Sequence, residues 1–157
     1  KAVFEMGGYS FDNRIEELGG KSVAEALLEP TRLYARPIKA ILRHYRVKNV
    51  VHGIAHITGG GLVENLARIV PPNVQVQLKR GSWRVPAIFD WIRNLGSIEQ
   101  TEMDRVFNMG IGMVLVVAPF YLESIQNQLF DLGLETWNIG TVTASGPKEQ
   151  RVTLTDE

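Results

Sequence analysis

The positions of apolar residues along the chain follow two periods, one typical of β-strands and one typical of α-helices. The runs at 50–57 and 113–117 have strand length and many β-branched residues, and 74–78 alternates between apolar and polar side chains. We expect 113–117 to be a central strand buried on both faces, and 74–78 to have one face in water. Further strands are expected at 135–143 and, as an edge strand, at 151–154.

Helical spacing of apolar residues recurs in several longer segments, most of which begin or end at a recognisable signal. Ser22 and Glu25 have the spacing of a capping box, and Thr31 is a suitable N-cap for a helix that reaches Tyr45. Pro37 lies inside that last segment and is expected to kink or delay its helix. Helices are expected at 22–28, 31–45, 62–70, 86–96, 99–107 and 119–132.

Strands and helices are interspersed along the chain, and the alternation at 74–78 differs from the continuous apolar pattern of a parallel sheet. This combination predicts an α+β domain, in which helices pack against a mixed sheet. A length of 157 residues suits one domain with a sizeable core, and no internal repeat or interdomain linker is visible. We therefore treat residues 1–157 as a single domain.

Composition narrows the classes of function. The chain has 45% hydrophobic residues, and 17 Lys or Arg balance 17 Asp or Glu, so a nucleic-acid partner is not expected. The absence of cysteine excludes disulfides, thiolate catalysis and zinc–thiolate sites. No apolar run reaches membrane-spanning length and no signal peptide is visible, so we expect a cytoplasmic protein without a membrane partner.

The stretch Thr58-Gly59-Gly60-Gly61 carries the strongest candidate chemistry, because it stands between an expected strand and an expected helix. This arrangement brings backbone N–H groups and the positive end of a helix dipole toward an anion. Glycine also lets a phosphate approach the backbone without meeting a Cβ atom. The stretch lacks the G-x-G-x-x-G and P-loop patterns. A tight turn that serves only packing explains an isolated glycine triplet about equally well.

Two histidines precede this stretch. His52 and His56 are four residues apart, which on a strand is about 13 Å, too far for one metal ion to join them. We therefore expect no metal site in this chain. His56 stands next to the turn, where it either orients the loop or meets a ligand, or is an ordinary buried histidine.

Other candidates follow the first glycine turn. Asn65 either ties the loop together by hydrogen bonds or touches the ligand, and Arg68 points either at the ligand or at solvent. A second glycine turn, 108–112, would form the facing wall of a ligand cleft, with Asn108 and Gly110 as its exposed members. Close backbone packing at the entry of a strand is the alternative for this second turn.

Four motifs, in this order along the chain, resemble one enzyme family. They are Leu-Leu-Glu-Pro-Thr-Arg-Leu-Tyr at 27–34, Ala-His-Ile-Thr-Gly-Gly-Gly-Leu at 55–62, Trp-Arg-Val-Pro-Ala-Ile-Phe at 83–89, and Phe-Asn-Met-Gly-Ile-Gly-Met-Val-Leu-Val-Val at 107–117. Nearly all of the chain resembles the C-terminal domain of the phosphoribosylformylglycinamidine cyclo-ligase family, the aminoimidazole ribonucleotide synthetases.

The resemblance implies a three-layer α/β/α fold that is partly ferredoxin-like. It also implies that an N-terminal domain for ATP binding and dimerisation would precede Lys1 and is absent from this chain. Enzymes of this family convert formylglycinamidine ribonucleotide and ATP to aminoimidazole ribonucleotide, ADP and phosphate in de novo purine biosynthesis. ATP and Mg²⁺ would be held mainly by the absent domain, and the full-length enzyme would be a homodimer.

By the same resemblance, this chain helps to bind the phosphoribosyl substrate and is inactive alone, and its catalytic residues remain unidentified. The alternative is a non-catalytic module of the same fold that binds a phosphate ligand or regulates. The residues expected at the substrate or phosphate are His56, Thr58, Gly59, Gly60, Gly61, Asn65, Arg68, Asn108 and Gly110.

Overall fold

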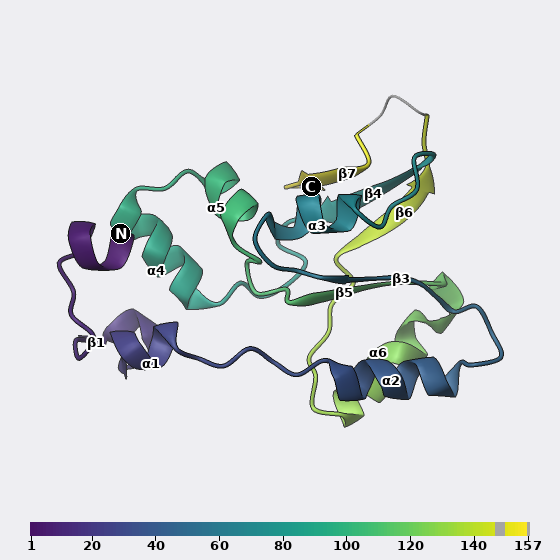
Figure 1. Ribbon diagram of the computed structural model, residues 1–157, viewed down its shortest axis with the longest axis horizontal. Helices are drawn as coiled ribbons and strands as arrows, with labels where there is room; N and C mark the ends of the chain where they lie inside the picture. The colour runs from purple at the N-terminus through teal and green to yellow at the C-terminus, as the bar shows by residue number, and fades with distance from the viewer. Residues whose placement is uncertain (147–149, 157) are drawn as a thin grey trace.

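The computed structural model describes residues 1–146 and 150–156 (Figure 1). Its described strands form three small sheets with the orders β1-β2, β3-β5 and β6-β4-β7. The strands are β1 (Arg14–Ile15), β2 (Lys21–Ser22), β3 (Val51–His56), β4 (Val74–Lys79), β5 (Met113–Val117), β6 (Gly140–Ala144) and β7 (Val152–Thr155). The α-helices are α1 (Val23–Leu27), α2 (Ala35–His44), α3 (Gly61–Ala67), α4 (Ala87–Gly96), α5 (Gln100–Val106) and α6 (Leu122–Asp131). Short turns of helix are η1 (Ala2–Met6), η2 (Glu16–Leu18) and η3 (Pro119–Tyr121).

The prediction of an α+β domain is confirmed at the level of class. The sheet around β4 is mixed, since β4 pairs antiparallel with β6 and parallel with β7. The edge position predicted for 151–154 is confirmed, because β7 lies at the end of that sheet. The three-layer, partly ferredoxin-like arrangement stays a prediction.

The prediction that 113–117 is a central strand is wrong for the described structure. These residues form β5, which pairs antiparallel with β3 alone, in a two-stranded sheet. All five residues are half-buried rather than buried. A run rich in β-branched residues indicates that its side chains are at least partly buried. Here they are covered by helices and face a cavity, instead of packing between neighbouring strands.

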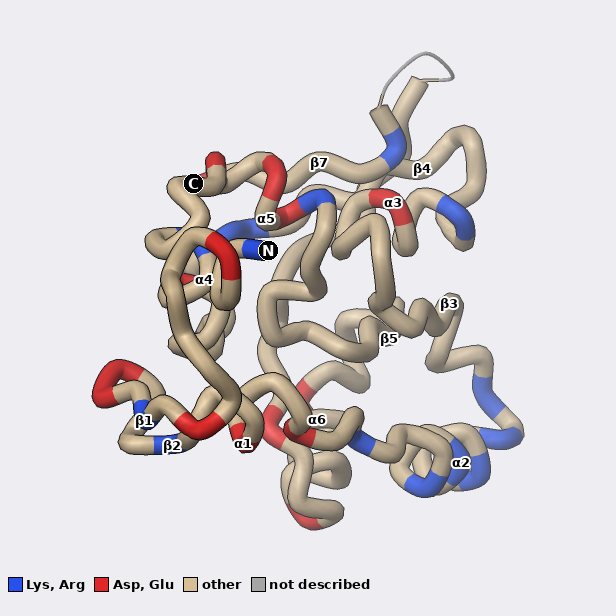
Figure 2. Tube along the Cα trace, turned by 60° about the vertical axis from the view of Figure 1, so that its left-hand side comes forward, with Lys and Arg blue, Asp and Glu red and all other residues tan. Residues whose placement is uncertain are grey.

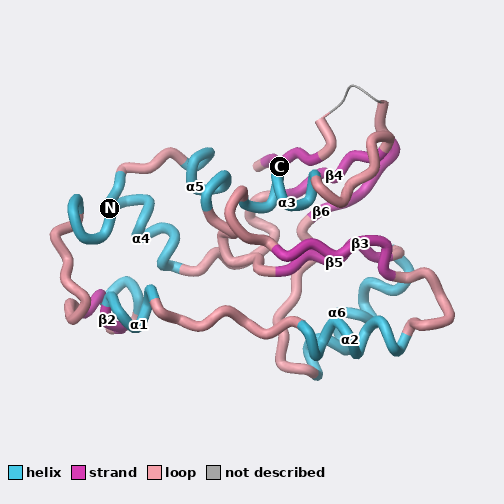
Figure 3. The backbone as a smooth tube through the Cα atoms, viewed as in Figure 1, coloured by secondary structure: helices cyan, strands magenta, loops and turns pink. Residues whose placement is uncertain are grey.

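The start of α2 also differs from the sequence prediction. Tyr34, not Thr31, is the N-cap residue, and 28–34 is an extended connection between α1 and α2 (Figure 3). Pro37 accounts for the difference, because a proline clashes with the carbonyl four residues earlier unless it lies in the first turn. With the helix starting at Ala35, Pro37 occupies that first turn.

The strand predicted at 135–143 begins later, at Gly140. Gly140 pairs with Leu78, and the N–H of Lys79 donates to the carbonyl of Ile139 at 2.9 Å. Since β4 ends at Lys79, the residues before Ile139 have no strand beside them. Trp137 and Ile139 instead pack against the main core.

The largest core cluster joins β3, α3, β4 and α5 beneath the first glycine turn. It includes Leu62 and Leu66 of α3, Val76 of β4 and Met103 of α5. A second cluster holds α2 against α6 through Ile41, Ile125 and Leu129. In the described part of the chain, no helix is long and apolar enough to cross a membrane.

Candidate functional site

The first glycine turn connects the end of β3 to the start of α3, as the sequence predicts. Gly60 and Gly61 have φ angles of 96° and 61°, in the left-handed region that favours glycine. A Cβ atom on Gly61 would overlap the backbone oxygen of Asp104 in α5, so packing alone requires this glycine. Gly59 is different, because its φ angle is outside that region and a Cβ atom there would meet nothing within 4 Å.

Several backbone N–H groups of this turn have no acceptor among the described residues. The N–H of Gly61 donates to the carbonyl of Thr58 at 3.1 Å. Within the described residues, the N–H groups of Thr58, Gly59 and Gly60 donate no hydrogen bond. Three successive donors without a protein partner suit an anion.

Asn65 ties this turn together from inside α3. The residue is only 5% exposed, and its Nδ2 donates to the carbonyl oxygens of Gly61 at 2.7 Å, Gly59 at 3.2 Å and Thr58 at 3.3 Å. Arg68, at the end of α3, donates to Oδ1 of Asn65 at 3.3 Å. The geometry therefore corresponds to the loop-tying alternative for Asn65. Arg68 acts on the turn through it.

The second glycine turn lies beside the first. The N–H of Ile57, just before the first turn, donates to the carbonyl of Gly112 at 2.9 Å. Within the second turn, Oδ1 of Asn108 accepts from the N–H of Gly110 at 2.9 Å, and Gly110 has a φ angle of 98°. A Cβ atom on Gly110 would lie 2.5 Å from Cδ of Pro86, so close packing also contributes to this glycine.

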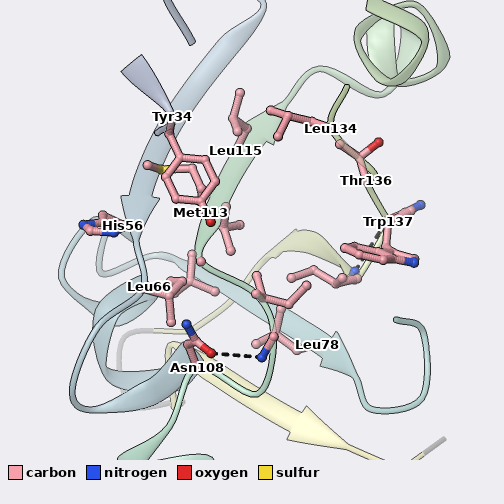
Figure 4. Close-up of a pocket in the computed structure, with 18 of the residues that line it drawn as sticks. Tyr34, His56, Leu66, Leu78, Asn108, Met113, Leu115, Leu134, Thr136 and Trp137 are labelled. Atoms are coloured by element: carbon pink, nitrogen blue, oxygen red, sulfur yellow. Dashed lines mark hydrogen bonds between the residues drawn. The ribbon is translucent and has the colours of Figure 1, made fainter. Parts of the chain in front are cut away.

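A cavity of about 1610 Å³ opens next to both turns (Figure 4). Of the nine predicted site residues, His56, Thr58, Asn108 and Gly110 line it. Gly59, Gly60, Gly61, Asn65 and Arg68 do not line it. Gly59 and Gly60 belong to the turn after Thr58, Gly61 and Asn65 to α3, and Arg68 to the end of α3. Apolar side chains from β5, β4 and the segment before β6 line part of the wall, including Met113, Leu115, Leu78 and Trp137.

Comparison with known proteins connects this geometry to a family. Residues 4–152 match the family model described as AIR synthase related protein, C-terminal domain. The chain belongs to this family.

Curated relatives of this AIR synthase related domain agree with the family model. The chain is 43% identical over 148 residues to the phosphoribosylformylglycinamidine cyclo-ligase of Symbiobacterium thermophilum, and 43% identical over 149 residues to that of Anaeromyxobacter dehalogenans. A Bifidobacterium longum protein of the same name is 38% identical over 144 residues. These alignments cover 92–95% of this chain but only 41% of each relative.

The structure of this AIR synthase related domain adds a residue that the sequence reasoning did not single out. Tyr34 lines the cavity and contacts His56, with ring centroids 6.0 Å apart and planes at 61° (Figure 4). A Cβ atom on Gly112 would overlap the Tyr34 hydroxyl, so Tyr34 reaches the second turn. The sequence feature that could have identified Tyr34 is its position at the end of the motif at 27–34. Arg32 and Arg84 also line the cavity and are exposed.

In this cysteine-free chain of the AIR synthase related family, the side chains that could hold a metal ion are histidines and carboxylates. Among the residues that the structure describes, no three His, Asp or Glu side chains are grouped so that they could hold a metal ion. His52 and His56 both lie on β3 and are both exposed. The site is therefore one of backbone donors, one buried amide and nearby cationic side chains.

Proposed function

We propose that this chain is the C-terminal part of an ATP-dependent cyclo-ligase of purine biosynthesis, and that its two glycine turns bind the phosphate of the ribonucleotide substrate. The relatives of that name support the first half of the proposal. The observation that carries the second half is the row of three unpaired N–H groups at Thr58, Gly59 and Gly60, beside the cavity.

In the reaction that the resemblance implies, ATP transfers its terminal phosphoryl group to the formyl oxygen of formylglycinamidine ribonucleotide. The amidine nitrogen then attacks the formyl carbon, which closes the ring and expels phosphate. Such reactions depend mainly on positioning and electrostatic stabilisation. Backbone donors at the first turn would fix the phosphate end of the substrate, and Asn65 would keep those donors in place.

ATP and Mg²⁺ belong to the proposal as ligands held mainly by another domain. Magnesium prefers carboxylate and phosphate oxygens, and the described residues of this chain do not group three acidic or histidine side chains. No step of the reaction is therefore assigned to a metal held here. The homodimer, the cytoplasmic location and the inactivity of the isolated chain are part of the same proposal.

Amide chemical-shift mapping tests the site. The isotope-labelled chain is titrated first with aminoimidazole ribonucleotide and then with ATP. We expect saturable shifts at 58–62 and 108–112 with the ribonucleotide, and smaller shifts with ATP. Shifts confined to α2 or α6 would show that the turns are not the site.

A chimaera tests the enzyme against the alternative of a non-catalytic module. The chain is joined to the remaining part of the Symbiobacterium thermophilum relative, in place of the segment that it matches. The cyclo-ligase proposal predicts turnover of formylglycinamidine ribonucleotide. A folded chimaera that still binds the ribonucleotide but forms no product would favour the module.

A further inference from the structure

A second segment, apart from the glycine turns, has a one-sided charge along the sequence. Residues 30–63 contain six Lys or Arg and no Asp or Glu, whereas residues 1–29 contain six Asp or Glu and three Lys or Arg. Figure 2 shows blue along α2 and the segment after it, and red mainly on the turn between β1 and β2 and on α1. The six cations are Arg32, Arg36, Lys39, Arg43, Arg46 and Lys48. Within the described parts of the chain, none of them lies in an ion pair.

Three of these cations form a stripe on α2. Arg36, Lys39 and Arg43 are spaced by three and four residues, so they share one face of the helix, and all are exposed. Pro37 and Ile41 are the buried residues of this helix. Like charges at these spacings destabilise a helix by a few tenths of a kcal/mol per pair. The fold alone therefore gains nothing from this arrangement.

Aromatic rings continue this surface beyond the end of α2. Ring contacts run from His44 to Tyr45, Tyr121 and Phe120, with successive centroids 4.6, 5.3 and 5.0 Å apart. Nζ of Lys48 lies 5.3 Å from the centre of the Tyr121 ring. Phe120 is 88% exposed, although a large apolar ring is normally at least partly covered.

We propose that this basic–aromatic surface docks an acidic protein segment that carries one aromatic or aliphatic anchor residue. The surface comprises Arg36, Lys39, Arg43, Arg46, Lys48, Tyr121 and Phe120. Carboxylates of the partner pair with the cations, and the anchor packs on Phe120, so that apolar and charged contacts act together.

Charge and ring geometry favour a protein segment over a nucleic acid. Single-stranded nucleic acids stack several bases on successive aromatic faces along a basic groove. Here the rings meet edge to face, Tyr45 is buried and Tyr121 half-buried, so Phe120 is the exposed ring of these three. A long polyanion would also approach the acidic residues 1–29. A short acidic segment avoids both problems.

The test uses a short synthetic peptide of Glu and Ser with one central Phe, titrated into the isotope-labelled chain. We expect saturable amide shifts at 43–48 and 119–122 and weaker binding as salt rises. Replacing both Arg46 and Lys48 by Glu weakens binding about tenfold or more, and Phe120→Ser weakens it several-fold. Phe130→Ser is the matched control, because Phe130 is 75% exposed on α6 and lies outside the surface.

Three results would overturn the proposal. They are the absence of saturable binding, binding that neither the double charge reversal nor Phe120→Ser weakens, and tighter binding of an oligouridylate of the same length. The substituted residues are exposed, so unchanged thermal unfolding checks that each variant is folded. Gly59→Val should leave peptide binding unchanged, which separates this surface from the phosphate site.

Discussion

At the scale of single residues, the three consecutive glycines have different reasons to be glycine. Gly61 is fixed by a positive φ angle and by its contact with the backbone of α5. Gly60 has a positive φ angle and lies against the Glu64 side chain. Gly59 has neither constraint, which agrees with the proposal that a ligand approaches its backbone.

Substitution of Gly59 therefore separates binding from folding. We expect Gly59→Val to weaken ribonucleotide binding about tenfold or more while changing the free energy of unfolding by less than about 0.5 kcal/mol. Titration calorimetry and urea unfolding measure the two quantities. Gly61→Ala should instead lower the free energy of unfolding, by about 2 kcal/mol or more, because the positive φ angle and the overlap with α5 strain the folded state. Unchanged ribonucleotide affinity in Gly59→Val would remove the case for a phosphate at this turn.

Glu64 offers a second test at this scale. A Cβ atom on Gly60 would lie 2.5 Å from Oε2 of Glu64, so the carboxylate stands beside the turn. A charge about 4 Å from a bound anion repels it by about 1 kcal/mol in water. We expect Glu64→Gln to raise the affinity for inorganic phosphate by about two- to fivefold, measured by amide shifts. Glu123→Gln, in the first turn of α6, is the control, and equal effects of the two would contradict a local site.

The two turns of the candidate site were predicted from the sequence, but the separate role of each residue in them was not. The glycine triplet and the turn at 108–112 were both predicted, and the structure places them side by side through Ile57 and Gly112. The sequence could not choose between the two roles of Asn65, because that choice depends on which carbonyls the buried amide reaches. Tyr34 was missed because its contacts are distant in sequence.

At the scale of elements, local signals predicted well where the element makes its own hydrogen bonds. The capping box at Ser22 and Glu25 is present at the start of α1, with both of its hydrogen bonds formed. The predicted starts of α2 and of the strand at 135–143 were wrong. The start of α2 is set within the helix by Pro37, which was expected to kink or delay it. The start of β6 depends on another segment, since β6 pairs only where β4 runs beside it. The prediction of a central strand at 113–117 was wrong for a similar reason. The strands that lie beside β5 are set by distant segments, and in the described structure β5 pairs with β3 alone.

The capping box predicts a pH dependence of stability. Hydrogen bonds from the Ser22 backbone and side chain lower the pKa of Glu25, so its carboxylate stabilises the folded state above the unfolded pKa, which is about 4.3. That stabilisation is lost as pH falls through the lower pKa of the folded state. We expect Glu25→Gln to lower the melting temperature at neutral pH and to have no effect below both pKa values. A difference that persists in strong acid would point to a cause other than the carboxylate.

At the scale of the whole molecule, a polar chain of side chains joins segments that are distant in sequence. Arg80, in the turn after β4, pairs with Asp104 of α5 and with Asp156 after β7. Gln100 continues the chain, because it donates to Asp104 at 2.9 Å and accepts from Arg93 of α4 at 2.6 Å. These linked polar side chains fix the sheet around β4 to the helices α4 and α5.

The two carboxylates of this chain are expected to contribute unequally. The Asp104 side chain is 14% exposed and the Asp156 side chain is 79% exposed. Asp104→Asn should lower the free energy of unfolding by about 1–3 kcal/mol, because it weakens a largely buried pair. Asp156→Asn should cost at most about 1 kcal/mol. Urea unfolding of both variants measures the difference, and an equal loss in the two would contradict the inward role of Asp104.

The hydrogen bond from the indole of Trp83 to the carbonyl of Met109, 2.9 Å long, gives the molecule an internal optical reporter. Trp83 is buried, and its partner lies inside the second glycine turn. The emission wavelength of an indole depends on the dipoles around it, so a ligand that moves this carbonyl should shift the fluorescence. With Trp91 and Trp137 replaced by Phe, Trp83 would be the single emitter, and occupancy of the turn could be followed in solution in real time without a label.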